Sequence, residues 1–340
     1  MNTFRWLLFP LTMLYAAALW IRHQLYDRQW LKSRNFDIPT IVIGNLVIGG
    51  AGKSPMTEYL VVLLKNRYQL ATLSRGYGRQ TKGFRLATED STAEEVGDEP
   101  LQFKRKFPNI TVAVCEDRCA GIERLQDTHD LVLLDDAFQH RKLKPLLSIL
   151  LFDFESLFQP IIPLPTGNFR DLMKQTRRAD IIMISKCPEL LTTAHKRHIE
   201  RIIKAHSQQP IFYSQIKYLP LISTHNEEFL SNIGAYTVVL FTGIANPQPL
   251  IDYLKRTAKS LTHLRFADHH AYSTHDLDTI KKSFDHIDVP NKIIITTEKD
   301  YQRLKKEDFA DYPLYLQPIA QRILHDKEFD NLVISSLQSR

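Results

Sequence analysis

The stretch IVIGNLVIGGAGKSPMTEYL, residues 41–60, passes from an apolar, β-branched run through a cluster of glycines into a pattern typical of a helix. Two interpretations are open: an ordinary strand-to-helix turn, or a loop that binds a nucleotide phosphate. Glycines let the backbone curve round an anion with its N–H groups pointing inward, and a helix N-terminus adds a favourable dipole. Because Lys53 and Ser54 follow the glycines directly, we favour the phosphate loop.

This loop predicts an ATP site with Mg²⁺. The Lys53 ammonium would reach the β- and γ-phosphates, and the Ser54 hydroxyl would ligate the metal. The usual spacing, GxxxxGK[ST], requires glycine at position 47, where this chain has Val47, so the prediction depends on the flanking strand and helix as well. The residues expected to contact the nucleotide are Gly49, Gly50, Ala51, Gly52, Lys53 and Ser54.

A second signal is the pair Asp135-Asp136, which follows the apolar run 131–134 in HDLVLLDDAFQHRKL. A carboxylate at the end of such a strand is where phosphate-loop proteins hold Mg²⁺, directly or through water. Acidic pairs also occur on solvated loops. Together with the phosphate loop, the pair favours a metal site.

The residues do not carry a clear guanine reader. The nearest candidate, ISKCPE at 184–189, has Ser185-Lys186, but its acidic residue, Glu189, is not at the position of the NKxD aspartate. We therefore favour an ATP-using catalyst over a GTP switch, with this segment as a candidate wall for the base.

Length and composition indicate a folded protein with room for two domains: 340 residues, 44% hydrophobic, 24% charged. The three cysteines, Cys115, Cys119 and Cys187, form no CxxC pair, which suits a reducing compartment and structural roles. The net charge of +6 and a pI near 9.0 would allow nucleic-acid binding. Most of the excess, however, lies in the apolar N-terminal segment, so we expect no nucleic-acid partner.

Residues 1–34 carry five basic residues against Asp27 alone, a net charge of +4. The uncharged run 6–21 is shorter than the ~20 residues that cross a bilayer, and Pro10 interrupts it. No small-residue cleavage site follows. We predict a helix that lies on the membrane, with Trp6, Trp20 and Trp30 near the headgroups and basic residues toward anionic lipid. A buried helix and a single span remain alternatives.

Apolar runs alternate with helical patterns over most of the chain, which predicts a mainly parallel α/β sheet with helices on both faces. We expect an N-terminal membrane-associated helix at 1–34, a phosphate-loop domain at 35–217 and a smaller α/β domain at 218–340. A closing helix near 325–337 could pack on either domain. The expected strands are 40–44, 70–74, 110–114, 130–135, 148–153, 180–185, 211–216, 237–241, 263–266 and 292–296.

With these motifs in view, the sequence resembles the tetraacyldisaccharide 4′-kinases of lipid A biosynthesis over nearly its whole length. Each motif is weak alone, but their order is specific. They are GNLVIGGAGKSP (44–55), SRGYGR (74–79), GDEP (97–100), CEDR (115–118), DDAFQH (135–140), PTGNFRD (165–171), FTGIANP (241–247), FADHH (266–270) and TTEKD (296–300).

The resemblance implies an ATP- and Mg²⁺-dependent kinase that phosphorylates the 4′-hydroxyl of an acylated glucosamine disaccharide 1-phosphate. The product would be lipid IVA, made on the cytoplasmic face of the inner membrane. Rival interpretations are a phosphate-loop kinase for a small soluble metabolite and a membrane-associated nucleotide-dependent switch or metal chaperone. The apolar N-terminus argues against the first, and the missing guanine reader and Cys/His cluster against the second.

The resemblance also implies roles for individual residues. Asp98 with His269 would accept the proton, Lys53 would stabilise the phosphates, and Glu99 would approach the metal held by Ser54 and the 135–136 pair. Without the resemblance, positions 98–99 would be interpreted as a solvated acidic turn. Since Asp98 and His269 belong to different predicted domains, we expect closure about a hinge near residue 217 and little ATP hydrolysis without acceptor.

Four residues are candidates for the sugar and its 1-phosphate, since arginine suits phosphate and tyrosine suits a sugar. Each arginine could equally be a surface charge. The chain departs from the family pattern at Val47-Ile48, at Ala137 and in GNFRD, the segment that contains Arg170. The candidates are Arg75, Tyr77, Arg118 and Arg170.

Overall fold

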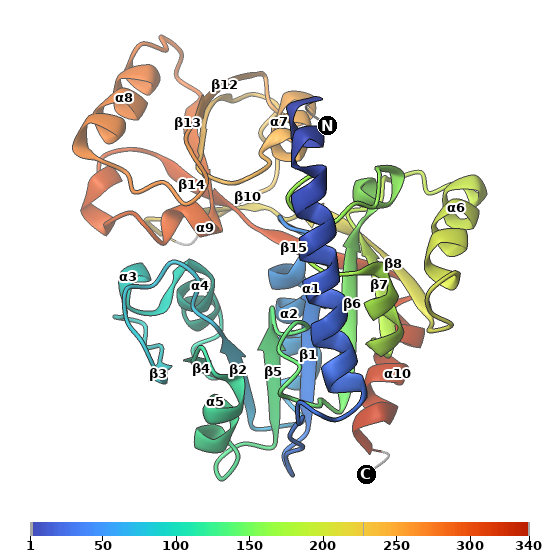
Figure 1. Ribbon diagram of the computed structural model, residues 1–340. Coiled ribbons are helices and arrows are strands. Elements are labelled where there is room, and N and C mark those ends of the chain that lie inside the picture. The colour runs from blue at the N-terminus through green and yellow to red at the C-terminus, as the bar shows by residue number, and fades with distance from the viewer. Residues whose placement is uncertain (1–2, 227, 339–340) are drawn as a thin grey trace.

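The computed structural model describes residues 3–226 and 228–338, so the ends of the expected outer segments lie outside the described residues. Nine strands form the larger sheet, in the order β15-β8-β7-β6-β1-β5-β2-β4-β3 (Figure 1). All neighbours from β8 to β4 are parallel, while β15 and β3 are antiparallel edges. The strands are β1 (Thr40–Asn45), β2 (Leu70–Ser74), β3 (Arg85–Leu86), β4 (Thr111–Val114), β5 (Leu131–Asp135), β6 (Leu147–Asp153), β7 (Ile181–Ser185), β8 (Ile211–Tyr218) and β15 (Ile319–Leu324).

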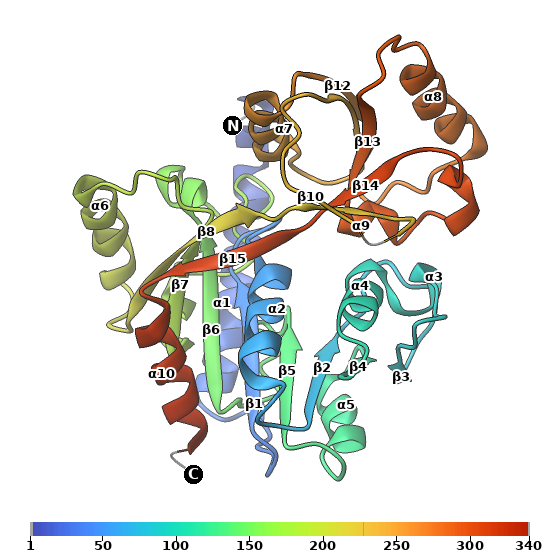
Figure 2. The same cartoon turned by 180° about the vertical axis from the view of Figure 1, so that it is seen from behind.

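Helices cover both faces of this sheet, which explains why its central strands are continuously apolar. Ile41 and Ile43 of β1 point into one core, with α2 (Lys53–Leu64), α4 (Asp98–Lys106) and α10 (Asp326–Gln338). Val42 points into the other, with α5 (Arg118–Leu125) and α6 (Thr193–Lys204). The mainly parallel, two-faced architecture predicted from the sequence is confirmed (Figures 1 and 2). Short helices in this part are α3 (Ala93–Val96), η2 (Phe154–Phe158) and η3 (Met173–Arg178).

A second, six-stranded sheet has the order β10-β9-β14-β13-β11-β12. Its helices α7 and α8 pack on opposite faces, each with its own apolar cluster. The elements are β9 (Leu221–Ser223), β10 (Phe229–Leu230), β11 (Thr237–Thr242), α7 (Gln248–Thr257), β12 (Ser260–Arg265), α8 (Thr274–Asp285), β13 (Lys292–Thr297), α9 (Glu298–Tyr301), η4 (Lys306–Phe309) and β14 (Leu314–Gln317).

The last part of the described chain, β15 and α10, belongs to the larger unit, whereas the expected division at 217–218 assigned it to the smaller domain. After β14 the chain returns to the larger sheet, where β15 pairs antiparallel with β8. The following helix, α10, inserts Phe329 into the core of the larger sheet, against the rings of Tyr59 and Phe212. Packing of this apolar face decides the position of the closing helix. The smaller unit is therefore an insertion between β8 and β15.

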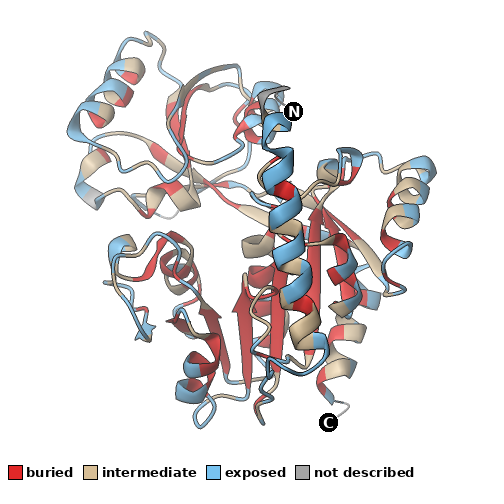
Figure 3. Ribbon diagram, viewed as in Figure 1, coloured by how far each residue is buried: buried red, intermediate tan, exposed pale blue. Residues whose placement is uncertain are grey.

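The N-terminal helices, η1 (Thr3–Leu8) and α1 (Phe9–Asp27), run along the outside of the larger unit (Figures 1 and 3). Only Thr12 and His23 of α1 are buried, so a helix inside the core is not observed. None of the described helices is long and apolar enough to cross a membrane. The exposed apolar side chains of this segment are Trp6, Leu7, Leu8, Phe9, Leu11, Met13, Leu14, Trp20, Ile21, Trp30 and Leu31.

The face of α1 that touches the protein is polar. Thr12 Oγ1 lies 2.8 Å from Thr166 Oγ1, and His23 Nε2 lies 2.6 Å from Asp171 Oδ1. Two arginines that we expected to face lipid instead donate to backbone carbonyls: Arg5 to Pro165 at 3.1 Å and Arg22 to Gln139 at 2.8 Å. The segment thus presents its polar stripe to the PTGNFRD motif and its apolar side chains to the outside.

Candidate active site

The phosphate loop connects β1 to α2. Gly49 and Gly52 have φ of 104° and 79°, a conformation that strongly favours glycine, and Gly52 caps the first turn of α2. The Ser185 hydroxyl donates to the Ala51 carbonyl at 2.7 Å and holds the loop from the next-but-one strand. A Cβ on Gly50 would lie 3.6 Å from the Lys186 ammonium, so a cation borders the loop. The loop therefore has the curvature and positive surroundings that an anion requires.

Lys53 starts α2 and points back toward the strand ends. Its Nζ lies 3.4 Å from Asn45 Oδ1 and 3.8 Å from Asp136 Oδ1. Ser54 follows in the first turn of α2 and is half-buried. The lysine and the serine of the motif thus open the helix that follows the glycine loop.

The two aspartates after β5 have different environments. Asp136, with φ of 50°, is bound by Arg170 through both carboxylate oxygens. Burial opposes its ionisation, but the Arg170 bonds and the Lys53 charge hold its pKa below the ordinary value. Asp135 is 1% exposed, and burial, together with the negative charge of Glu99, raises its pKa to about 7.

These environments bear on the metal. Asp135 Oδ1 is buried without a hydrogen-bond partner. A buried, unpartnered carboxylate oxygen next to a second carboxylate, Glu99, is the hard donor set that Mg²⁺ prefers. Asp136 is instead occupied by Arg170 and Lys53. The donor set fits Mg²⁺ through Asp135 more directly than through Asp136.

The two units meet at Asp98, the first residue of α4. His269 Nδ1 lies 2.7 Å from Asp98 Oδ2, a contact between residues 171 apart in sequence. Arg303 donates to the same carboxylate from Nε at 2.9 Å and from Nη2 at 2.5 Å. Burial opposes ionisation of Asp98, but its bonds to His269 and Arg303 hold the pKa at about 2. The carboxylate is therefore an anion clamped between an imidazole and a guanidinium.

The four predicted substrate residues fall into two groups. Arg75 and Tyr77 are exposed, and the Tyr77 ring lies 5.6 Å from the His269 ring. Arg118 is 4% exposed and donates to the carbonyls of Cys115 and Glu116 at 3.1 and 2.9 Å. Arg118 therefore stabilises the loop that contains Cys115 and Glu116, while Arg75 and Tyr77 are open to a ligand. Arg170 is half-buried against Asp136 and Asn45.

Two residues at the site were not predicted: Arg303 on Asp98, and Lys299, whose Nζ lies 3.2 Å from His269 Nε2. TTEKD contains Lys299 and lies just before Arg303, but nothing in the pattern shows which residues across the chain they meet. Asn45, inside the quoted motif, was also overlooked; it accepts from Lys53 and Arg170.

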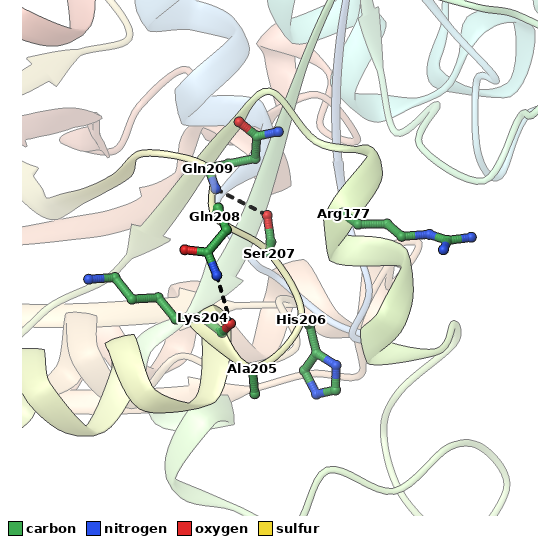
Figure 4. Close-up of a pocket in the computed structure, with 7 residues that line it drawn as sticks. All are labelled: Arg177, Lys204, Ala205, His206, Ser207, Gln208 and Gln209. Atoms are coloured by element: carbon green, nitrogen blue, oxygen red, sulfur yellow. Dashed lines mark hydrogen bonds between the residues drawn. The ribbon is translucent and has the colours of Figure 1, made fainter.

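The cysteines and the surface hollows lie apart from these groups. All three cysteines are buried and free, in line with structural roles. Cys119, Asp117 and His140 approach one another, but burial raises the pKa of Cys119 and the Lys142 ammonium lies 3.6 Å from Asp117. A hollow of about 410 Å³, formed by Arg177 and residues 204–209, contains no predicted site residue (Figure 4). Convergent charged groups, not this hollow, mark the site.

Comparisons with known proteins agree with this geometry. The Tetraacyldisaccharide-1-P 4′-kinase family model matches residues 4–338. The "Tetraacyldisaccharide 4′-kinase" of Flavobacterium johnsoniae is 40% identical, with 99% of this chain and 98% of the relative covered. The protein of the same name from Bacteroides thetaiotaomicron is 39% identical, with 95% and 90% covered.

Among solved structures, the chain is similar to "apo" form LpxK from Aquifex aeolicus, crystallised in complex with ATP. The TM-score is 0.77 at 27% identity, and the match covers 98% of this chain and all of the other. Family, relatives and fold agree over the full length, phosphate loop and inserted unit included. The chain belongs to the tetraacyldisaccharide-1-P 4′-kinase family.

Proposed function

We propose that this protein transfers the γ-phosphoryl group of ATP to the 4′-hydroxyl of a tetraacyldisaccharide 1-phosphate, giving lipid IVA. Family membership over residues 4–338 supports the reaction. The observation that carries it is the contact of Asp98 with His269 between the two units, beside the unit that holds the phosphate loop. Alcohol phosphorylation requires a proton acceptor as well as a phosphate loop, and Glu99, the residue after Asp98, interacts electrostatically with Asp135, as Lys53 does.

The phosphates of ATP bind to the amides of residues 49–54 and to the Lys53 ammonium. Ser54, Asp135 and Glu99 are the residues that would hold Mg²⁺, with Asp136 kept in place by Arg170. When bound, the metal neutralises negative charge on the β- and γ-phosphates. Lys53 adds positive charge at the same phosphates, and its contact with Asn45 aims the ammonium across the loop.

The acceptor hydroxyl loses its proton to the Asp98–His269 pair. The Asp98 carboxylate holds Nδ1 of the ring, so Nε2 is the nitrogen that faces away from Asp98 and takes the proton. Tyr77, exposed beside the same ring, and Arg75, exposed two residues earlier, bind the disaccharide or its 1-phosphate. Arg170 acts indirectly, through Asp136.

The acyl chains stay in the membrane, which the exposed apolar face of η1 and α1 contacts from the cytoplasmic side of the inner membrane. Leu7, Leu11 and Leu14 are more than half exposed at helical spacing, an unusual concentration for a face in water. The polar stripe binds the segment 165–171, so the apolar face is directed away from the protein. The same segment leads to Arg170, which links the membrane face to the phosphate site.

The smaller unit closes over the substrate by bending where β8 and β15 leave the larger sheet. Leu219 and Pro318 pair at this point, with the Leu219 amide donating to the Pro318 carbonyl at 3.0 Å. Two strands crossing together make a hinge near the expected residue 217. Acceptor lipid would then favour the state in which Asp98 meets His269.

The reaction is tested with purified protein, Mg·ATP and the disaccharide 1-phosphate lipid in detergent, following product mass. We expect one added phosphate on the distal sugar. A product without it, or phosphate transfer only to a soluble sugar, would refute the lipid assignment. A reaction that proceeds equally well in the presence of excess EDTA would refute the metal.

Membrane binding is tested separately by flotation with anionic vesicles. Leu7→Glu with Leu14→Glu should release the protein while leaving its melting temperature unchanged, since both side chains are exposed (76% and 69%). Leu190→Glu, at 78% exposure outside this face, is the matched control and should stay bound. Retention of the double variant on vesicles would exclude this face as the membrane contact.

A further inference from the structure

TTEKD, residues 296–300, is a motif that the proposed reaction leaves unexplained. Its last residue, Asp300, is fully buried and accepts from the Gly243 amide at 3.0 Å and the Thr297 hydroxyl at 2.7 Å. Thr297 in turn caps α9 by accepting from the Asp300 amide. These bonds tie α9 to the loop after β11, where the Gly243 carbonyl accepts from the His269 amide at 3.1 Å. Lys299 is held on this framework.

Lys299 contacts the reactive end of the histidine. Its Nζ lies 3.2 Å from His269 Nε2, and an ammonium has only donors, so Nε2 must be the acceptor. The ring proton then sits on Nδ1 and is donated to Asp98 at 2.7 Å, and Arg303 Nη2, 3.1 Å from the same nitrogen, donates to the Asp98 carboxylate and not to the ring. Asp98 on one nitrogen and Lys299 on the other therefore select the same neutral form of His269.

We propose that Lys299 is a positioning residue that covers Nε2 of His269 until the acceptor hydroxyl replaces it. The inference rests on the proposed role of His269 as proton acceptor. Asp268, whose Oδ1 lies 3.9 Å from Lys299 Nζ, is the partner onto which the displaced ammonium moves. Binding of the lipid thus exposes Nε2 of His269. Without lipid this nitrogen is covered and does not activate water for attack on ATP.

Charged groups lie on every side of His269. Asp98 and Asp268 are the anions, Lys299 and Arg303 the cations, and the Tyr77 ring covers a further side. Asp300 lies behind them, where burial raises its pKa. The ring thus has two charges of each sign beside it. Removal of Lys299 leaves an excess of negative charge at Nε2.

In the reaction the 4′ O–H bond breaks and its proton goes to Nε2. The hydroxyl oxygen forms the new bond to the γ-phosphorus, and the bond from that phosphorus to the bridging oxygen breaks. Its electron pair leaves with ADP, and His269 later returns the proton to solvent. Lys299 takes no part in bond making; it decides when Nε2 is available.

The experiment compares Lys299→Met, which keeps the length but removes the charge, with Lys299→Arg, which keeps the charge. Lys255→Ala, an exposed lysine of α7, is the control. For Lys299→Met we expect the acid limb of the kcat profile to move to higher pH, because a positive charge 3.2 Å from Nε2 is removed. We also expect a severalfold rise in lipid-independent ATP hydrolysis at alkaline pH. The KM for ATP should be unchanged, and Lys299→Arg should restore most of the wild-type profile.

A merely structural lysine would lower kcat at every pH and would not raise hydrolysis without lipid. Superimposable pH profiles and unchanged lipid-independent hydrolysis in Lys299→Met would overturn the proposal. If Lys299→Met fails to fold, as judged by its melting curve, Lys299→Gln gives the same readouts. His269→Ala separates the two ideas: full activity there removes the proton-acceptor role itself, whereas loss there with a wild-type Lys299→Met removes only the role of Lys299.

Discussion

The contact between Asp98 and His269 allows a quantitative test by a double-mutant cycle. Asp98→Asn keeps the shape of the side chain but removes its charge, and His269→Ala removes the ring. Both side chains lie at the junction of the two units, and the Asp98 side chain is only 9% exposed. We expect each single change to lower kcat by about 10² to 10⁴, the range for a lost general base.

The coupling energy follows from the environment of Asp98. Its pKa falls from 3.8 to about 2, and one pKa unit corresponds to about 1.4 kcal/mol. Because this fall remains after the opposing effect of burial, the two partners together favour the ionised carboxylate by more than about 2 kcal/mol. Arg303 accounts for part of this, so the share of His269 is smaller. A coupling of about 1 to 2 kcal/mol should remain in the cycle.

The assay is kcat at saturating lipid and ATP for the four proteins, with Asp278→Asn, an exposed residue of α8, as a control. We expect the double variant to be faster than the product of the two single losses predicts, by roughly 5- to 30-fold, which is the coupling given above, because residues in direct contact do not act additively. Losses that multiply in the double variant would show that Asp98 and His269 act independently, and the proton pathway proposed above would then be wrong.

Three further changes test other parts of the structure. Lys53→Ala should weaken ATP binding and lower kcat by about 10² or more, with an unchanged melting temperature; equal ATP affinity in a titration would refute the phosphate loop. Burial raises the pKa of Glu58 from 4.5 to about 7, although the Lys106 ammonium opposes this change. Between these two values the folded protein holds a proton on Glu58 that the unfolded chain has lost. The free energy of unfolding therefore falls as the pH rises through this range. Glu58→Gln should flatten that fall in melting temperature, and an unchanged slope would contradict the assignment. Phe329→Ala should cost about 3 to 5 kcal/mol in urea unfolding, and a loss under about 1 kcal/mol would show that α10 is not part of the core.

Much of the fold was predictable because buried parallel strands are continuously apolar. The runs at 40–44, 148–153 and 292–296 became β1, β6 and β13 with nearly the same ends. β15 was missed, since its sequence IAQRIL places polar residues between apolar ones on an edge strand. Its two polar residues are adjacent, so the run lacks the strict alternation that marks a half-buried strand.

The position of the closing helix shows a different limit. Its pattern was recognised at 325–337, but an apolar stripe does not specify which surface covers it. Contacts with Tyr59 and Phe212 place it on the larger unit. The N-terminal segment is similar: its lack of charge was visible, whereas the polar contacts of Thr12 and His23 were not.

The sequence by itself determined the phosphate loop, because its glycine torsions, its lysine and the helix start are properties of neighbouring residues. It also determined the family, through the order of its motifs. Tertiary structure alone decided that Asp98, His269, Lys299 and Arg303 meet, and that Asp135 Oδ1 stays unpartnered while Asp136 binds Arg170. These contacts depend on the strand order of the larger sheet and on how the inserted unit sits against it, and local patterns do not encode either arrangement.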